Sequence, residues 1–337
     1  MKTIRKFLSI TAVLLLTLTM FGCSSASSSA APSESSEETV LTIAIVKQLD
    51  HPSLDEIANA AAAKLDALAA EKKIVIHYEI YSGQNDPSTL QQIGEQLVSE
   101  EVDAIIPIAT MAAQVMTNAA AEKKIPVIFG AVSDPEGADL TGIDYVSGTS
   151  DALNTNFIMD MILKEDPDTA KVGLLYSTSE INSEKPIAEA KAFLDSHNIP
   201  YVEATGTTAD EVLTAASVLI SEEVDAIFTP TDNVIMDSEL ALAPLFIAAG
   251  IKHYAGADSF VRNGAYATCG VNYTDLGAYS AQLAVTAATA GMEGLEDYYL
   301  MEGGIITVNT ETAQALSADY SVFKDMGTLV EVITTEE

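Results

Sequence analysis

LVSEEVDAII at residues 97–106 and LISEEVDAIF at residues 219–228 are nearly the same sequence, 122 positions apart. The similarity extends outward from both copies, because short β-branched segments alternate with longer Ala-rich segments of helical period through the two halves. Strands and helices in strict alternation are typical of parallel sheets that helices cover on both faces. The chain is therefore predicted to be an α/β protein with two similar, Rossmann-like lobes.

Each half is expected to contain the same elements in the same order. The first half has expected strands at 41–46, 74–81, 103–108 and 126–130, and helices at 53–70, 88–99 and 111–123. The second half has expected strands at 171–176, 199–204, 225–230 and 252–257, and helices at 183–197, 210–221 and 233–249. The repeated SEEVDA is interpreted as a helix end that leads into a buried strand, with its Asp as a turn residue and not as a binding site.

The N-terminus is interpreted as a targeting segment. Basic residues among the first six precede an apolar run at 7–21, which is shorter than a membrane span, and a Gly-Cys pair follows. A Cys directly after the small residue at a cleavage site resembles the lipobox of bacterial lipoproteins, whose thiol takes a diacylglyceryl group. Residues 1–22 are thus predicted to be a lipoprotein signal peptide, Cys23 the lipidated residue, and residues 23–39 a flexible tether. An ordinary secretory signal is the alternative.

The charge balance excludes nucleic acid as a partner. The chain has 16 Lys and Arg against 49 Asp and Glu, and without residues 1–22, which hold three of the basic residues, its formal charge is −36. Such a surface repels nucleic acid but tolerates a zwitterion. The only cysteines are Cys23 and Cys269, so no disulfide framework is expected, and Cys269 is interpreted as a small core residue.

No catalytic pattern is present in the sequence. The four histidines lie in no metal-ligand spacing, and the GxSxG, GxGxxG and P-loop patterns are absent. No loop offers an activated nucleophile or a paired acid and base. We therefore expect neither an enzyme nor a metal or cofactor.

Polar loops rich in Ser, Thr, Asn and Asp follow the expected strands in both halves. In open α/β sheets, ligands bind beyond the carboxyl ends of the strands, where helix N-termini present unpaired N–H groups. Two such sets of loops therefore predict a ligand cleft between the lobes. Helix capping is the alternative account of each single residue, as for Ser53 and Glu56, which are predicted to form a capping box.

Seven segments carry a resemblance to a known family: HPSLD (51–55), GQNDPSTL (83–90), FGAVSDP (129–135), VSGTSD (146–151), YSTSEINSE (176–184), PTDN (230–233) and VNYTDLG (271–277). In this order and spacing they resemble the tryptophan/tyrosine-type substrate-binding proteins of ABC transporters, over residues 39–304. The resemblance implies a type I periplasmic-binding-protein fold, an amino acid, often aromatic, in the cleft, and ABC permease and ATPase subunits as partners. Met111 departs from the family pattern, in which Pro is common at that position.

The resemblance also implies three crossovers between the lobes. They are predicted near 145–150, 258–265 and 297, where they form a three-strand hinge suited to closure around a ligand. Lobe 1 then comprises 40–146 and 260–297, and lobe 2 comprises 147–259 and 298–337. In this division residues 264–291 supply a strand and a helix of lobe 1, and residues 303–316 begin with a strand of lobe 2.

An amino acid presents a carboxylate, an ammonium and a side chain, and each of these groups needs different protein contacts. Its carboxylate should meet hydroxyl and N–H groups at helix starts, for which the candidates are Thr110, Ser133, Ser179 and Asn182. Its ammonium requires a carboxylate, because burying an unpaired charge costs several kcal/mol. Asp232 is the first candidate, followed by Asp258 and Asp134. Asp232 could equally cap the helix that begins at Asn233.

The remaining candidates would contact the side chain of the ligand. His51 and Pro52 could form a flat surface against an aromatic ring of the ligand, although His51 could instead be a surface turn residue. Asn85 and Glu180 could contact polar groups of the ligand. Ser53, Thr231 and Asn233 complete the predicted set.

The predicted function is that of a monomeric solute-binding lipoprotein, anchored by lipid outside the cytoplasm, that captures an aromatic amino acid by hinge closure and delivers it to a permease. Alternatives are a sensory lipoprotein that presents its ligand to a receptor, a binder of another solute such as a branched-chain amino acid or nucleoside, and a surface-structural or adhesive lipoprotein without a ligand.

Overall fold

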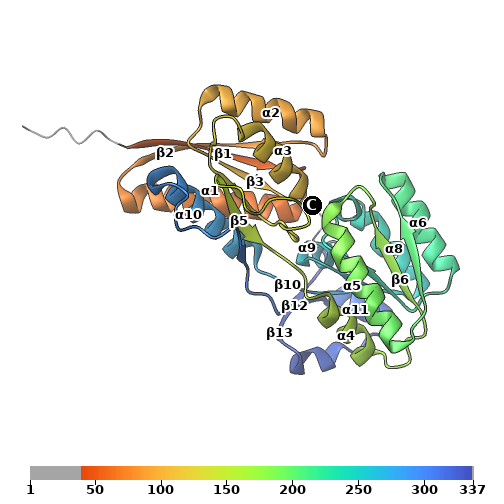
Figure 1. The fold of residues 1–337 in the computed structure, drawn as a ribbon. Helices are drawn as coiled ribbons and strands as arrows, with labels where there is room; N and C mark the ends of the chain where they lie inside the picture. Colours follow the sequence, from red (N-terminus) through yellow and green to blue (C-terminus); the bar gives the residue numbers. More distant parts are fainter. Residues whose placement is uncertain (1–38, 336–337) are drawn as a thin grey trace, which may run out of the picture. The chain divides into compact units, whose positions relative to one another are not determined.

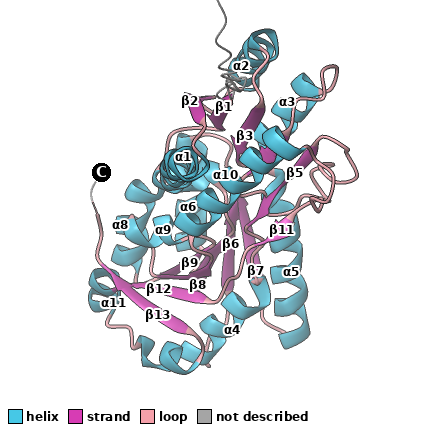
Figure 2. Cartoon of the chain, turned by 90° about the vertical axis from the view of Figure 1, so that its left-hand side faces the viewer, coloured by secondary structure: helices cyan, strands magenta, loops and turns pink. Residues whose placement is uncertain are grey.

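The computed structural model describes residues 39–335, which form two lobes, each built on one sheet (Figure 1). The predicted signal peptide, Cys23 and all but the last residue of the predicted tether lie outside the described residues. Helices cover both faces of the sheets, as Figure 2 shows. Within the described part of the chain, no helix combines the length and the apolar character that a membrane crossing requires.

Lobe 1 is built on a parallel sheet with the strand order β11-β5-β4-β3-β1-β2. Its strands are β1 (Val40–Lys47), β2 (Val75–Ser82), β3 (Ala104–Ile108), β4 (Val127–Phe129), β5 (Val146–Ser150) and β11 (Tyr299–Leu300). Its helices are α1 (Pro52–Lys72), α2 (Pro87–Glu100), α3 (Thr110–Ala120) and α10 (Tyr273–Ala290). Alternate residues of β1 pack on opposite faces: Ile43 and Ile45 against α1 and α10, Ala44 and Val46 against α2 and α3.

Lobe 2 is built on a sheet with the strand order β13-β12-β10-β9-β8-β6-β7, in which only the β10–β12 pair is antiparallel. Its strands are β6 (Val172–Tyr176), β7 (Tyr201–Thr205), β8 (Ala226–Thr229), β9 (Lys252–Ala255), β10 (Ala267–Gly270), β12 (Ile305–Asn309) and β13 (Thr328–Val332). Its helices are α4 (Thr155–Glu165), α5 (Ile181–His197), α6 (Ala209–Ser221), α7 (Asn233–Asp237), α8 (Glu239–Ala249), α9 (Asp258–Arg262), α11 (Thr310–Leu316) and the 3₁₀ helix η1 (Tyr320–Asp325).

The two sheets repeat one arrangement, which confirms the predicted pair of similar α/β lobes. The order β2-β1-β3-β4-β5 in lobe 1 matches β7-β6-β8-β9-β10 in lobe 2. The aspartates of the repeated SEEVDA have equivalent roles: Asp103 accepts a hydrogen bond from the N–H of Thr42 (2.7 Å), and Asp225 accepts one from the N–H of Lys171 (2.9 Å). Each therefore ties the third strand of its lobe to the first, as expected of a turn residue.

The prediction that the strand within residues 264–270 belongs to lobe 1 is wrong. Ala267 pairs in parallel register with Tyr254 of β9, so β10 is the fifth strand of lobe 2, as β5 is of lobe 1. The chain passes between the lobes at 151–154, 271–272 and 301–304, so each crossover lies later than the predicted 145–150, 258–265 and 297. The lobe bounds predicted at 147 and 298 are corrected with them, because β5 and β11 belong to the sheet of lobe 1. As predicted, α10 packs on lobe 1 and β12 lies in lobe 2.

The helices that follow the fifth strands are exchanged between the lobes. After β5 the chain enters lobe 2 as α4, and after β10 it enters lobe 1 as α10. Ile158 and Ile162 of α4 are buried in one cluster with Val172 and Leu174 of β6, and α10 packs against α1 and against β3, β4 and β5. The core of lobe 1 therefore includes a helix that is distant in sequence from the strands it covers, whereas α4 directly precedes β6 in the chain.

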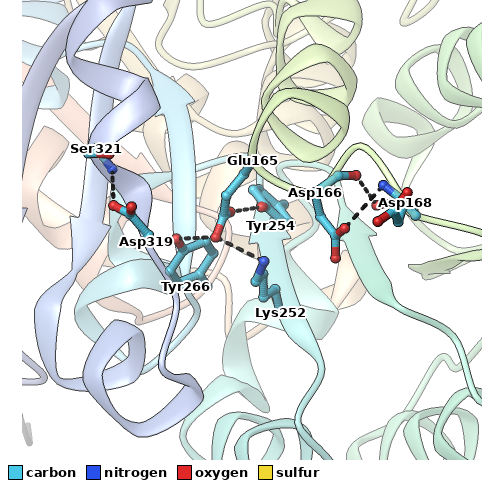
Figure 3. A network of polar contacts seen from close by, with 9 residues as sticks. Glu165, Asp166, Asp168, Lys252, Tyr254, Tyr266, Asp319 and Ser321 are labelled. Carbon is cyan, nitrogen blue, oxygen red and sulfur yellow. Dashed lines mark hydrogen bonds and ion pairs between the residues drawn. The ribbon is translucent and has the colours of Figure 1, made fainter.

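A buried carboxylate fastens α4 to its sheet (Figure 3). The side chain of Glu165, 2% exposed, pairs with Lys252 (2.9 Å) and accepts hydrogen bonds from the hydroxyls of Tyr266 (2.8 Å) and Tyr254. The two tyrosine rings are fully buried and pack edge to face, 5.4 Å between centroids. Because Lys252 and Tyr254 belong to β9 and Tyr266 precedes β10, one side chain joins the exchanged helix to two strands.

Glu165→Ala is expected to lower the free energy of unfolding by about 3 kcal/mol, because it leaves two buried hydroxyls and an ammonium without their acceptor. Urea denaturation measures the change. Asp144→Ala is the matched control, since Asp144 pairs with Lys124 on the surface, where such pairs contribute less than about 1 kcal/mol. Equal effects of the two substitutions would contradict the anchoring role of Glu165.

Candidate functional site

The strand order determines where a binding site is expected, at the carboxyl ends of the strands of each sheet. In a sheet of order 2-1-3-4-5, ligands bind at the switch point between the first and third strands. Those strands are β1 and β3 in lobe 1, and β6 and β8 in lobe 2. The loops and helix starts that follow β3 and β8, together with the start of α1 and of α5, line a common cavity.

Many residues predicted from sequence meet in this cavity. The structure places there His51, Ser53, Thr110, Ser133, Asn182, Thr231, Asp232 and Asn233. The first four come from lobe 1 and the others from lobe 2, so the cavity lies between the lobes as the polar loops predict. Their contribution to ligand binding stays a prediction.

Other predicted residues do not line the cavity. Asp258 lies in a separate crevice, because its carboxylate turns back onto Arg262 (3.1 Å). Asp134 faces Lys185 of lobe 2 at 3.5 Å, and Ser179 is exposed and bonded to the hydroxyl of Ser177 (2.8 Å). Pro52 begins α1 with His51 at the N-cap position, so the predicted capping box at Ser53 is wrong. Asp258 and Asp134 are thus removed as partners for a ligand ammonium.

Asp232 is saturated by the protein. Its Oδ1 accepts hydrogen bonds from the N–H groups of Val234 (3.1 Å) and Ile235 (3.0 Å), which makes it the N-cap of α7. Its Oδ2 accepts from the N–H of Ser177 and the hydroxyl of Ser183, both at 2.7 Å. A carboxylate has about four acceptor positions, and all of them are used here. Between the two roles left open by the sequence, the structure therefore favours helix capping.

Asp151 is a cavity carboxylate that sequence reasoning missed. It follows β5 directly, is 4% exposed, and accepts hydrogen bonds from the hydroxyls of Ser133 (2.8 Å) and Tyr273 (3.1 Å). Burial raises its pKa, and no cationic side chain of residues 39–335 forms an ion pair with it. Each oxygen keeps one free acceptor position. The sequence signal was present, because VSGTSD at 146–151 ends in this residue.

Gln48, also missed by the sequence analysis, joins the lobes. Its Oε1 accepts a hydrogen bond from the N–H of Met111 (3.1 Å), which fixes the orientation of the amide. Its Nε2 then donates to Asn85 of lobe 1 and to Glu180 of lobe 2, each at 3.0 Å. The predicted residues Asn85 and Glu180 thus bind this glutamine beside the cavity.

Glu180 is buried at the seam between the lobes. Besides Gln48, it binds the Nδ2 of Asn233 (2.6 Å), whose Oδ1 lies 3.0 Å from Nε2 of His51 in lobe 1. Burial, reinforced by the neighbouring charge of Asp232, raises the pKa of Glu180 to about 7.

Serine and threonine hydroxyls also meet across the cleft, as in the pair Ser133 and Thr231 (2.9 Å). The lobes are therefore in direct contact, and the cavity between them is closed to this extent.

Two lobes that meet over a polar cavity, joined by three crossing segments, define a hinged binding protein. The family model described as ABC transporter substrate binding protein matches residues 42–320. The chain therefore belongs to the family of ABC transporter substrate-binding proteins, as its motifs predict. Its fold is that of the type I periplasmic binding proteins.

Characterised relatives resemble the chain over most of its length. A tyrosine-binding protein of Clostridioides difficile (strain R20291) is 30% identical over 321 residues, 93% of this chain and 92% of the relative. A Streptococcus pneumoniae ABC domain solved in complex with L-Trp has a TM-score of 0.77 at 26% identity, covering 87% of this chain and 100% of that one. A ligand-free, open substrate-binding protein with adhesive properties from C. difficile has a TM-score of 0.65 at 27% identity, covering 88% and 100%.

Glu180→Gln is expected to remove a pH dependence of stability. The pKa of Glu180 is raised in the folded protein, so its stabilising contribution is present below about pH 4.5 and is lost as the pH rises through about 7. Relative to wild type, the variant should thus gain about 3 kcal/mol of unfolding free energy between pH 4.5 and pH 8. Urea unfolding across this range measures the difference, and a difference that stays constant with pH would show that Glu180 does not titrate in this way.

Proposed function

We propose that this protein is the solute-binding lipoprotein of an ABC importer, which captures an aromatic amino acid between its lobes and delivers it to a permease. The observation that carries the proposal is Asp151, a buried carboxylate that lines the closed cavity and lacks a cationic partner in residues 39–335. An ionised carboxylate in such a place is costly unless a positive charge joins it. The ammonium of an amino acid supplies that charge.

The start of α3 suits the carboxylate of the same ligand. The N-cap position of α3 is Ala109, whose side chain cannot accept a hydrogen bond, so Gln48 is the side chain that accepts from the start of this helix, at the N–H of Met111. Ala109 also has φ 76° and ψ 164°, a backbone region that costs about 1–3 kcal/mol for residues other than glycine. The neighbouring Thr110 adds a hydroxyl at the cavity wall. An anion at this position would be stabilised by the helix N-terminus.

Apolar side chains complete the cavity and support an aromatic ligand. Leu54 of lobe 1 faces the cavity together with Met236 and Phe260 of lobe 2. Such walls favour an apolar ring, because sulfur and aromatic edges pack well against one. The relatives that bind tyrosine and L-Trp support the same ligand class.

L-tryptophan, L-tyrosine or L-phenylalanine is expected to raise the melting temperature of the mature protein, because a ligand that binds only the folded state stabilises it. Since the chain contains no Trp, bound tryptophan can also be followed by its own fluorescence. Asp151→Asn should weaken binding at least about 100-fold by removing the charge that faces the ammonium.

Asp258→Asn is the matched control for this experiment, because Asp258 is an aspartate outside the cavity and should leave the affinity unchanged. A response to sugars or nucleosides alone would refute the amino-acid assignment. Unchanged affinity of Asp151→Asn would remove Asp151 from the site.

The lipid anchor and the location outside the cytoplasm are part of the proposal and rest on the signal-like segment before Cys23. Cells that express the full chain should incorporate labelled palmitate into it, and Cys23→Ala should abolish the label while the protein is still made. Cys269→Ala is the matched control, since Cys269 is a buried core residue. Labelling that persists in Cys23→Ala, or that is lost in Cys269→Ala, would refute the anchor.

A further inference from the structure

One nitrogen of His51 has no hydrogen-bond partner within residues 39–335. The side chain of His51 lines the cavity and is 7% exposed, and its Nδ1 is fully buried. A buried polar atom without a partner is costly, so native proteins rarely leave one without a reason. Because this atom belongs to a cavity residue, a ligand can supply the missing partner.

The surrounding amides determine which kind of partner is missing. Asn233 points its Nδ2 at Glu180 (2.6 Å), so its Oδ1 is the atom that faces His51 Nε2 (3.0 Å). An amide oxygen can only accept, and Nε2 of His51 must therefore carry the hydrogen. Burial lowers the pKa of His51, which favours the neutral ring. In a neutral ring protonated at Nε2, Nδ1 is a bare lone pair, so it requires a hydrogen-bond donor.

An amino acid has few donors to offer. Its carboxylate has none, and its ammonium is drawn to the ionised Asp151 before a neutral imidazole. The ammonium has three N–H groups, for which Asp151 and the hydroxyls of the cavity residues are the acceptors. The donor that distinguishes one aromatic ligand from another is on its side chain, which is the phenol O–H of tyrosine or the indole N–H of tryptophan. Phenylalanine has no such group and would leave Nδ1 buried without a partner.

We infer that Nδ1 of His51 accepts a hydrogen bond from the side chain of the ligand and thereby selects tyrosine or tryptophan over phenylalanine. The inference rests on the proposed function, since it assumes an aromatic amino acid whose ammonium binds Asp151. Sites that hydrogen-bond a ligand's hydroxyl or N–H discriminate strongly against the analogue that lacks it, because their own polar groups stay unpaired. Glu180 and Asn233 are positioning residues in this arrangement, as they fix the tautomer of the ring.

Calorimetric titration of the mature protein with L-tyrosine and L-phenylalanine tests the inference, because these ligands differ by one hydroxyl. Wild type should bind phenylalanine about 100-fold more weakly than tyrosine. His51→Phe keeps a flat ring but removes the acceptor. It should therefore weaken the binding of tyrosine and bring the affinities for tyrosine and phenylalanine to within about fivefold of each other. Asp151→Asn is the control, because it should weaken the binding of both ligands equally and preserve the ratio of their affinities.

The outcomes separate this inference from the proposed function. Equal affinities of wild type for phenylalanine, tyrosine and tryptophan would overturn the role of His51 and leave an aromatic amino-acid binder. The role of His51 would also be overturned if the ratio of the affinities for tyrosine and phenylalanine were unchanged in His51→Phe. The comparison of ligands on wild type does not depend on whether His51→Phe folds. Failure of all three amino acids to bind would refute the proposed function itself.

Discussion

Three carboxylates are buried where the lobes meet, and each must be satisfied in a place from which water is largely removed. Asp232 is satisfied by four donors of its own lobe. Glu180 is satisfied by amides from both lobes, so its hydrogen bond with Gln48 exists only while the lobes are together, whereas its bond with Asn233 lies within lobe 2. Asp151 has only two hydroxyls. The same chemical group therefore caps a helix, holds the lobes together, and, in our proposal, binds the ligand, depending on which donors surround it.

These side chains converge because the two lobes share one strand order. In each lobe the first and third strands are neighbours, and the helices that follow them diverge to opposite faces of the sheet. The loops at these two edges meet, so residues 182 positions apart in the sequence, His51 and Asn233, come within hydrogen-bonding distance. Lobe closure is thus coupled to side-chain contacts that neither lobe can make alone.

The repeated sequence was sufficient to predict two α/β lobes, because strand and helix periods are local properties. It was not sufficient to assign β10 to a lobe, because the sequence of a short apolar strand does not identify the sheet to which the strand belongs. The pairing of β10 with Tyr254 of β9 determines that sheet. Similarly, the sequence identified Asp232 as a polar residue at a helix start but could not count its donors. Asp151 and Gln48 were missed for the same reason: their roles depend on partners from distant segments.

The exchanged helices determine when the protein can become compact during synthesis. The strands of lobe 1 up to β5 are made early, but α10, which covers them, ends only at Ala290 of a 337-residue chain. On a nascent chain, α1 alone would therefore cover one apolar face of the first sheet until most of the polypeptide has left the ribosome, although domains usually fold as they emerge. The core of lobe 1 is therefore completed only late in synthesis, although most of its strands belong to the first half of the chain.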